Sequence, residues 1–578
     1  MKSQQLPRQW RVRPVVKRKA VIEKKVRDNP ELGPQQGGER RAQEPEPYAE
    51  RLKDDRLCEH SKSAKKCHAQ QTRADQAVIR LRNILHKLRY CTAFSFIPPV
   101  LVLTALTLFN TEMPRFRTIP TLLVLSVLVF YGAFYGATLF MLHSNGFGIE
   151  RLIIFGQDGD SYEYVSLAQT MISDGRFAMS QGSVPESFRT PGYPALLAVI
   201  LLLTNSLAVI PIVQIVLAAF SCGLIYLLGE YFFSSRVGLA AALLFALEPA
   251  VVTNAFISAS DIPFVFLLLC GAYTMTAHKR GAWTLFSGGM LFGAAALVRP
   301  LGLYVIPLVL VWLLWDAYSA DRKAFPRWRP VLRASALFLL GAALFVAPWM
   351  ARNYTLFHQA TLSSVGGYNL LFYAQEFEHQ RTGKSKEVVA AETNLLLGVG
   401  PGDDITTAPF ARRDSTVAMH YILAHPFEYA AFHLYSMVPF YLGSSIETLD
   451  RALYLRGLRA GTLPPDINIS VLLRTGDFSG TARALGSNLP ALLERIVWLL
   501  LCAAAFGTTV WAVLRRMPDA AVYMLFFALI LAFGLMTGPV SYSRYRLPVD
   551  PFIFILGCAG IAQAAGYFKH NEKLLSKA

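Results

Sequence analysis

The chain has 578 residues, of which 53% are hydrophobic and 16% are charged, and its mean hydropathy is +0.36. Soluble domains carry about 25% charged residues, so this composition excludes an ordinary soluble enzyme and indicates an all-α polytopic membrane protein. The formal net charge is +17, but residues 1–90 alone hold 23 basic and 11 acidic side chains. The excess of positive charge therefore belongs mainly to the first segment, and it does not indicate a nucleic-acid partner.

Residues 1–90 are predicted to form a disordered basic tail on the cytoplasmic side. Charge blocks alternate there with Pro, Gly and Gln, and the apolar residues are too few to bury a core. A basic stretch ahead of a hydrophobic segment is retained in the cytoplasm and can contact anionic lipid. Cys58, His60, Cys67 and His68 fit no familiar zinc spacing, so a solvated tail is favoured over a metal site.

Beyond residue 90, apolar runs occur at about the length that a bilayer requires. They predict a transmembrane bundle of about 11–13 helices. Because loop 143–190 and Asp261 are expected on the same side, one of the three runs between residues 191 and 257 is expected not to span. The runs are 93–109, 119–142, 191–204, 207–229, 237–257, 262–277, 283–298, 300–315, 334–351, 491–514, 519–540 and 547–568.

Basic loops near Lys279, Arg322 and Arg515 set the predicted orientation, because cytoplasmic loops are enriched in Lys and Arg. An apolar piece at 429–444 is predicted to lie at the membrane interface rather than to cross it. The expected organisation is a bundle over 91–351 with a first extracytoplasmic loop at 143–190, an extracytoplasmic region at 352–490, C-terminal transmembrane helices at 491–568 and a cytoplasmic tail at 569–578.

The first outer loop contains the leading candidate for chemistry, Asp160. Tyr164, Leu167, Ala168 and Met171 follow it at helical spacing and form a face that can lie on the bilayer. Asp160 is interpreted either as the N-cap of this helix, worth about 1 kcal/mol, or as a general base whose pKa is raised by partial desolvation. The local sequence leaves both interpretations open.

Two further acids stand at the ends of apolar runs, Glu248 before Pro249 and Asp261 two residues before Pro263. Burying either carboxylate is costly, so each is a functional candidate, with structural capping as the alternative. The segment 352–427 has the size and position of an acceptor-binding domain and is explained equally well as a solvated loop.

Five motifs occur in order along the chain: Asp160–Tyr164, Arg189–Pro194, Pro348–Tyr354, Gly367–Leu370 and Ser543–Phe552. Together they resemble motifs of the polyprenyl-phosphate-sugar-dependent glycosyltransferases of the type C fold. These are relatives in glycosyltransferase family 39, which includes protein O-mannosyltransferases and bacterial lipid A aminoarabinose transferase. The resemblance covers roughly residues 119–568 and implies a type C transmembrane bundle with an extracytoplasmic loop domain.

The resemblance implies that the acidic residue of the first outer loop is the catalytic base, which places this role on Asp160. Relatives have Asp-Glu where this chain has Asp160-Ser161, and Asp158 lies two residues earlier. This departure leaves open which aspartate acts, with Asp160 favoured. Asp261 resembles a second acidic position of the family.

The donor that the resemblance implies is a sugar phosphate linked to a long isoprenoid. Arginine suits such a ligand because its guanidinium stays charged and meets phosphate oxygens bidentately. Arg189, Arg544, Arg546 and Arg352 are the predicted donor-phosphate ligands, and Arg299 is a further candidate. The alternative for each is an interfacial arginine that extends to the membrane surface, favoured for any single one except Arg189 and Arg546.

These observations predict a hexosyl- or pentosyltransferase of a bacterial inner membrane, with its active site on the periplasmic side. The acceptor is expected to be a lipid, glycan or protein hydroxyl, and inversion at the anomeric carbon is expected because a single displacement suffices. The alternatives are a transporter or flippase of lipid-linked sugars and a scaffold protein. No cofactor is predicted, because nucleotide-binding motifs are absent. Two or three carboxylates near one mouth could hold a divalent cation, but no His-rich ligand spacing supports one.

Overall fold

The computed structural model describes residues 118–154, 159–180, 183–276, 281–320, 328–400, 406–455, 479–480 and 488–566. Within these ranges, regular secondary structure is helical, together with an isolated antiparallel bridge between Ala178 and Pro185. The all-α prediction is therefore confirmed for the described part of the chain. The two predicted tails, the run 93–109 and Asp158 lie outside the described residues.

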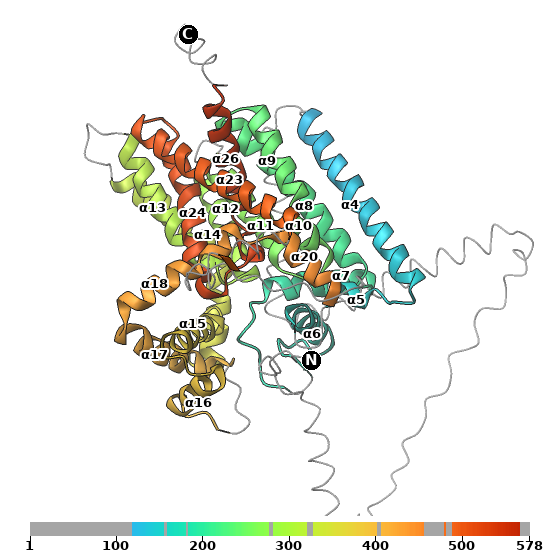
Figure 1. Ribbon diagram of the computed structural model, residues 1–578, viewed down its shortest axis with the longest axis vertical. Coiled ribbons are helices and arrows are strands. Elements are labelled where there is room, and N and C mark those ends of the chain that lie inside the picture. Colours follow the sequence, from blue (N-terminus) through green and yellow to red (C-terminus); the bar gives the residue numbers. More distant parts are fainter. Residues whose placement is uncertain are drawn as a thin grey trace, which may run out of the picture. The chain divides into compact units, whose positions relative to one another are not determined.

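The apolar helices follow the predicted runs closely. Figure 1 shows them as a set of long helices lying alongside one another. They are α4 (Thr118–Ser144), α7 (Gly192–Thr204), α8 (Val209–Phe232), α9 (Ser235–Leu247), α10 (Pro249–Phe256), α11 (Asp261–Thr276), α12 (Ala282–Val298), α13 (Gly302–Ala320), α14 (Trp328–Phe357), α23 (Leu489–Leu514), α24 (Ala520–Thr537) and α26 (Asp550–Ala564).

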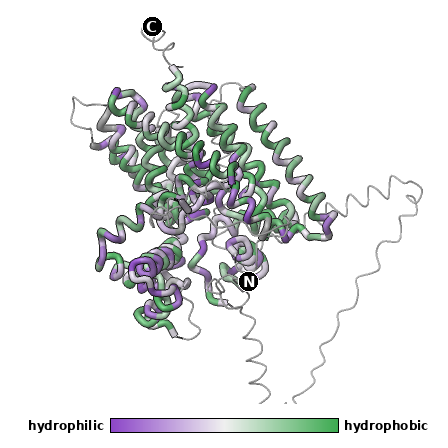
Figure 2. The backbone as a smooth tube through the Cα atoms, viewed as in Figure 1, coloured by the Kyte–Doolittle hydropathy of each residue, from purple (hydrophilic) through white to green (hydrophobic). Residues whose placement is uncertain are grey.

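Shorter and more polar helices connect and cover one end of this set. They are α5 (Glu150–Ile153), α6 (Asp160–Ser173), α15 (Val365–Thr382), α16 (Lys386–Leu397), α17 (Ala408–Ala424), α18 (Pro426–Ser436), α19 (Val438–Leu442), α20 (Ser445–Leu455), the 3-10 turn η2 (Gly538–Val540) and α25 (Ser543–Arg546). In Figure 2 the long helices are predominantly hydrophobic, whereas α15 to α18 carry most of the hydrophilic residues at the end where α6 also lies.

Five described helices, α4, α8, α14, α23 and α24, are long and apolar enough to cross a membrane, and the bent pair α9–α10 makes a sixth if it is one span. Five further apolar helices or helical stretches, in α7, α11, α12, α13 and α26, are shorter. Large apolar side chains remain exposed on α4, including Val129 at 71% and Phe140 at 74%. Such a surface requires a hydrocarbon solvent, and the chain is a multi-pass membrane protein.

The predicted run 237–257 is divided into two helices, α9 and α10, which meet at an angle of 55°. Pro249 lacks an N–H donor, and its ring disfavours the helical conformation at the preceding residue. Glu248 accordingly adopts an extended conformation, with φ −65° and ψ 120°. The sequence locates the apolar run correctly and misses this break.

The outer helices α15 and α17 pack against each other around Leu371, Ala374, Leu397 and Ala418. The segment ahead of α15 is joined to the first outer loop, because the backbone N–H of Ser364 donates to the carbonyl of Ser187 at 2.9 Å. The predicted interfacial piece 429–444 is divided between α18 and α19. These contacts fix the loop that carries Arg189.

Candidate active site

Six charged side chains from five segments of the chain meet where the apolar bundle borders the polar helices. They come from the start of α6, the loop before α7, the start of α11, the residue after α12, and α25. We refer to them as the site cluster, and its members are Asp160, Glu163, Arg189, Asp261, Arg299 and Arg544. The three carboxylates and three guanidiniums balance in formal charge.

Asp160 is the first residue of α6, and each of its carboxylate oxygens faces a different guanidinium. Arg189 Nη2 lies 2.7 Å from Oδ1, and Arg544 Nη1 lies 3.2 Å from Oδ2. Gly159 occupies the N-cap position of α6, without a side-chain capping bond. The capping interpretation of Asp160 is therefore wrong, and the side chain is used for ion pairing.

Asp261 is fully buried and ties two arginines together. Arg299 Nη1 donates to its Oδ1, while Arg544 donates to Oδ2 through Nε at 3.1 Å and Nη2 at 2.9 Å. Arg544 therefore bridges Asp261 and Asp160. Two positive charges offset the cost of burying this carboxylate, so its contacts anchor the arginines.

Side-chain exposure increases from Asp261 outward. It is 0% for Asp261, 12% for Arg299, 17% for Arg189, 19% for Arg544 and 37% for Asp160. Asp160 is thus the carboxylate of the cluster most open to an incoming molecule. The arginines are partly covered, where their interaction with a phosphate is less weakened by water than at the surface.

The arginines control the ionisation of Asp160. Burial on its own would raise the pKa of this carboxyl, but the charges of Arg189, Arg544 and Arg299 outweigh burial and hold its pKa well below the usual range. Glu163 differs, because burial dominates the effect of Arg189 and its pKa is raised. The arginines therefore favour the ionised form of Asp160 more strongly than that of Glu163.

The loop carrying Arg189 is held by aromatic rings and by a close backbone contact. The Arg189 guanidinium carbon lies 4.9 Å from the centre of the Phe188 ring and 5.4 Å from that of Tyr164. A Cβ on Gly192 would lie 2.6 Å from the carbonyl oxygen of Leu297, so only glycine allows the start of α7 to meet the end of α12. This contact brings the Arg189 loop next to Arg299.

The helical face that follows Asp160 is buried in protein. Tyr164, Leu167, Ala168 and Met171 are all covered, and the ring centres of Tyr164 and Tyr193 lie 4.9 Å apart in an edge-on arrangement. The prediction of a bilayer-facing helix is therefore wrong, because α6 uses this face to pack on α7.

Arg352 lies near the C-terminal end of α14 and outside the site cluster. Its Nη1 donates to the backbone carbonyl of Glu186 at 2.8 Å, and its guanidinium carbon lies 4.6 Å from the centre of the Trp349 ring. These contacts support the loop before Arg189. Arg352, although predicted as a phosphate ligand, is therefore not grouped with Arg189 and Arg544.

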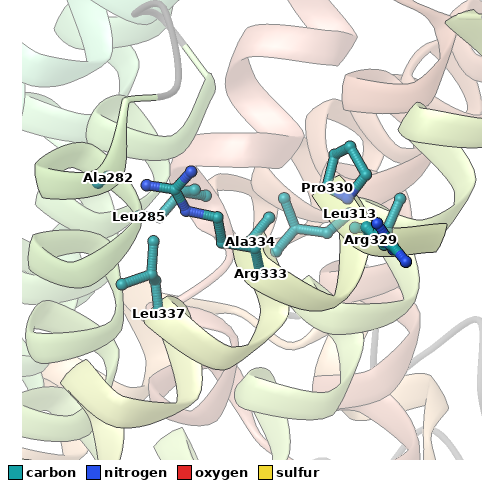
Figure 3. Close-up of a pocket in the computed structure, with 9 residues that line it drawn as sticks. Ala282, Leu285, Leu313, Arg329, Pro330, Arg333, Ala334 and Leu337 are labelled. Carbon is teal, nitrogen blue, oxygen red and sulfur yellow. The ribbon is translucent and has the colours of Figure 1, made fainter. Parts of the chain in front are cut away.

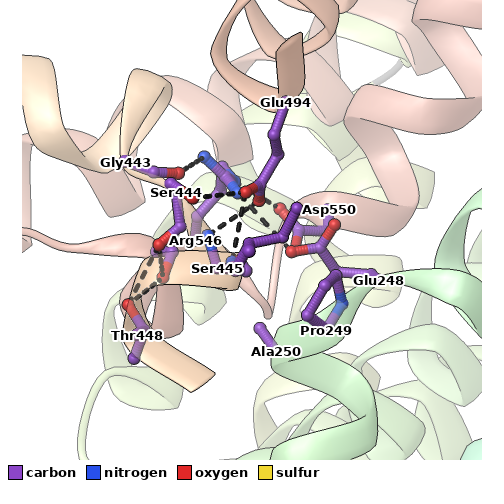
Figure 4. A network of polar contacts seen from close by, with 12 residues as sticks. Glu248, Pro249, Ala250, Gly443, Ser444, Ser445, Thr448, Glu494, Arg546 and Asp550 are labelled. Atoms are coloured by element: carbon purple, nitrogen blue, oxygen red, sulfur yellow. Dashed lines mark hydrogen bonds and ion pairs between the residues drawn. The ribbon is translucent and has the colours of Figure 1, made fainter. Parts of the chain in front are cut away.

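Arg546 also lies apart from the site cluster, in a second buried network shown in Figure 4. Its Nε donates to Asp550 Oδ1 at 3.0 Å, and its Nη2 lies 3.8 Å from Glu248 Oε1. Arg546, one of the predicted donor-phosphate ligands, is thus fully buried and separate from Arg544, because residues two apart on a helical turn point in nearly opposite directions. Arg544 faces the cluster and Arg546 faces away from it.

Two members of the site cluster were given little or no role by the sequence interpretation, namely Glu163 and Arg299. Glu163 lies within the first motif, and Arg189 Nε donates to its Oε2. Its position three residues after Asp160 puts both carboxylates on one face of a helix, which was the available signal. Arg299 becomes recognisable only when the end of α12 is seen beside the start of α11.

A cavity of about 610 Å³ lies elsewhere, between α12, α13 and the start of α14 (Figure 3). Its walls are mostly aliphatic and include Arg329 and Arg333, whereas Arg352 lies near the other end of α14. None of the site cluster lines it. Within the described ranges, no group of three or more His, Cys, Asp or Glu side chains is arranged to hold a metal ion.

Comparison with known proteins confirms the family resemblance. Residues 188–350, which include Arg189 and Arg299, match the family model described as dolichyl-phosphate-mannose-protein mannosyltransferase. No curated protein matches the chain.

Comparison with solved structures finds matches at low sequence identity. One is the archaeal oligosaccharyltransferase AglB of Archaeoglobus fulgidus, in complex with an inhibitory peptide and a dolichol-phosphate. It has 14% identity, a TM-score of 0.42, and coverage of 79% of this chain and 52% of that one. Another is ArnT of Cupriavidus metallidurans bound to undecaprenyl phosphate, with 13% identity, a TM-score of 0.32, and coverage of 76% and 78%. The chain thus spans about half the length of the archaeal protein.

Proposed function

We propose that this multi-pass membrane protein is a glycosyltransferase that takes a sugar from a polyprenyl phosphate. The observation that carries the proposal is the pairing of a partly exposed carboxylate, Asp160, with two guanidiniums, those of Arg189 and Arg544. A reaction that removes a proton from a hydroxyl while a phosphate leaves requires this combination of groups. The family match over residues 188–350 supports the choice of donor.

In the proposed reaction, Asp160 takes the proton of the acceptor hydroxyl as the acceptor oxygen attacks the anomeric carbon. The bond from that carbon to the phosphate oxygen breaks, and its electron pair leaves with the polyprenyl phosphate. The phosphate thereby changes from a diester to a monoester and gains negative charge. Arg189 and Arg544 stabilise this developing charge without further rearrangement, because Asp261, Glu163 and the surrounding helices already hold them.

We propose that the transfer proceeds with inversion. A retaining mechanism through a covalent intermediate requires a second carboxylate that is free to attack the sugar. Asp261 is fully buried and bonded to two arginines, and Glu163 is bonded to Arg189. Neither is available as a nucleophile in this arrangement. The proposal also places the reaction at the extracytoplasmic face of a bacterial inner membrane, with a lipid, glycan or protein hydroxyl as acceptor.

The test uses the purified full chain in lipid nanodiscs with a polyprenyl-phosphate sugar and an envelope extract as acceptor. Mass spectrometry of released polyprenyl phosphate is expected to show turnover by the wild type and a loss of about 10²- to 10⁴-fold in Asp160→Asn, since a general base contributes this much. Normal turnover in the variant would exclude the proposed role of Asp160.

The same purified chain, reconstituted in proteoliposomes, separates this enzyme from a transporter of lipid-linked sugars. A transporter would move the donor across proteoliposome membranes and leave the bond between sugar and phosphate intact. Movement without release of polyprenyl phosphate, with every acceptor fraction tested, would favour the transporter.

A further inference from the structure

Arg546 is a fully buried arginine whose hydrogen bonds lead into the body of the bundle. Its Nη1 lies 3.3, 3.0 and 3.2 Å from the carbonyl oxygens of Phe440, Tyr441 and Gly443. Its Nε donates to Asp550, and its guanidinium carbon lies 3.3 Å from the centre of the Trp498 ring. Figure 4 shows Gly443, Asp550 and Glu248 around Arg546. The guanidinium thus fixes α25 against α19, α23 and α26.

The helix that carries Arg546 is a single turn. α25 contains only Ser543–Arg546, and one turn of helix has little stability of its own, so its surroundings determine its direction. Arg544 projects from this turn to Asp160 and Asp261. Any rotation of α25 about its axis would therefore move the Arg544 guanidinium out of the site cluster.

Two carboxylates near Arg546 lie outside α25. Asp550 is the first residue of α26, and Glu248 lies at the break between α9 and α10. On the other side of the turn, Ser543 Oγ lies 3.0 Å from Thr448 Oγ1 of α20. The turn is therefore held from several directions, and Arg546 provides the most extensive of these contacts.

We infer that Arg546, held by Asp550 and Glu248, is a positioning residue that sets the direction of Arg544 and thereby the affinity of the site for the donor phosphate. The inference rests on the proposed function, since it assigns the phosphate to Arg544. It gives the buried network a role in binding although none of its members contacts the site cluster.

The test is a double-mutant cycle read out as the binding of polyprenyl phosphate to the full chain in phosphatidylcholine nanodiscs. Arg544→Gln removes a charged phosphate ligand and is expected to weaken binding about tenfold. Arg546→Lys keeps the positive charge but cannot hold Asp550 and three carbonyls at once, and is also expected to weaken binding. If Arg546 acts through Arg544, the double variant binds no more weakly than Arg544→Gln alone.

Three results would overturn the inference. One is a double variant whose loss is the product of the two single losses, since independent effects add in free energy. Another is unchanged affinity in Arg546→Lys, and the third is unchanged affinity in Arg544→Gln. If Arg546→Lys does not fold, Asp550→Asn takes its place in the cycle, because it removes the ion pair and keeps the side-chain size.

Tyr523→Phe is the matched control, because it removes a buried hydrogen bond of 3.2 Å between the first turn of α24 and the end of α8, whereas α25 follows the other end of α24. Its affinity for polyprenyl phosphate is expected to equal that of the wild type. The cycle also separates the two proposals. A wild type that binds and shows the non-additive pattern but transfers no sugar contradicts the glycosyltransferase alone, whereas transfer with an additive cycle contradicts the positioning role alone.

Discussion

Arginines engage both carboxylate oxygens of Asp160, and this lowers its strength as a base. The cluster is balanced in formal charge, so a donor phosphate adds a negative charge that competes with Asp160 for Arg189 and Arg544. As these contacts weaken, the arginine charges offset less of the pKa increase that burial causes, and the pKa of Asp160 rises. We therefore expect donor binding to convert Asp160 into a stronger base.

Replacing Arg189 with Gln tests this electrostatic control. In the wild type the arginines hold the pKa of Asp160 below its ordinary value of 3.8, so the base stays deprotonated at any pH above that value. In Arg189→Gln, burial is offset less, the pKa rises, and the acidic limb of kcat/KM against pH moves to higher pH.

The control for this profile is Arg381→Gln, which breaks an ion pair with Glu378 on α15, outside the site cluster. Its acidic limb is expected to coincide with that of the wild type. Identical acidic limbs in Arg189→Gln and the wild type would contradict the assignment of Asp160 as the base.

Single residues of the site were predictable to the extent that a motif contained them. Asp160, Arg189 and Arg544 lie in the motifs that the sequence revealed, and they meet in the structure. Arg299 was weakly indicated, because its pairing with Asp261 depends on how two helices meet. Arg546 lies in the same motif as Arg544 but in a separate buried network, and the motif does not show which way each arginine points.

Among the elements, α7 depends on a backbone contact that a single methyl group would break. Gly192 lies against Leu297 and Val298 at the end of α12, and backbone atoms there cannot move aside as a side chain can. Arg189 lies three residues before Gly192, and Arg299 directly follows α12. The spacing between these two helices therefore sets the distance between two arginines of the site.

Gly192→Ala is expected to destabilise the protein by about 1–3 kcal/mol through overpacking and to reduce transfer. The measurements are the Tm in detergent and the release of polyprenyl phosphate. Gly132→Ala on α4 is the control, because a Cβ there has no atom within 4 Å, and it is expected to keep both properties. If Gly192→Ala had the same Tm and the same release of polyprenyl phosphate as Gly132→Ala, the close contact between α7 and α12 would not be required for stability or transfer.

Element boundaries were predictable wherever hydrophobicity alone defines them, as for α4, α12 and α24. The break at Glu248-Pro249 was missed because the apolar pattern continues across it. The packing of α6 was also missed, since an apolar helical face fits a bilayer and a neighbouring helix equally well. Hydrophobicity identifies the buried face and does not identify what covers it.

On the scale of the whole molecule, polar residues gather over α15 to α18 at the end that carries α6 (Figure 2). The basic loops near Lys279, Arg322 and Arg515 predict that this end faces the extracytoplasmic side, because cytoplasmic loops are enriched in Lys and Arg. The proposed donor and acceptor would then meet on the extracytoplasmic side.

Glu387→Cys on α16 and Arg515→Cys after α23 test this orientation with a thiol reagent that does not cross membranes. Both positions are exposed. In intact spheroplasts, labelling above that of the parent protein is expected for Glu387→Cys, and for Arg515→Cys only after the membrane is opened. The reverse pattern would show that the chain is oriented the other way.

We propose that Arg189 and Arg544 hold the donor phosphate beside Asp160. A cryo-electron microscopy map of the full chain in nanodiscs with polyprenyl phosphate would show this arrangement directly. We expect phosphate density within hydrogen-bonding distance of both guanidiniums. A phosphate bound instead beside Arg333 in the cavity between α12, α13 and α14, with the site cluster unchanged, would contradict it.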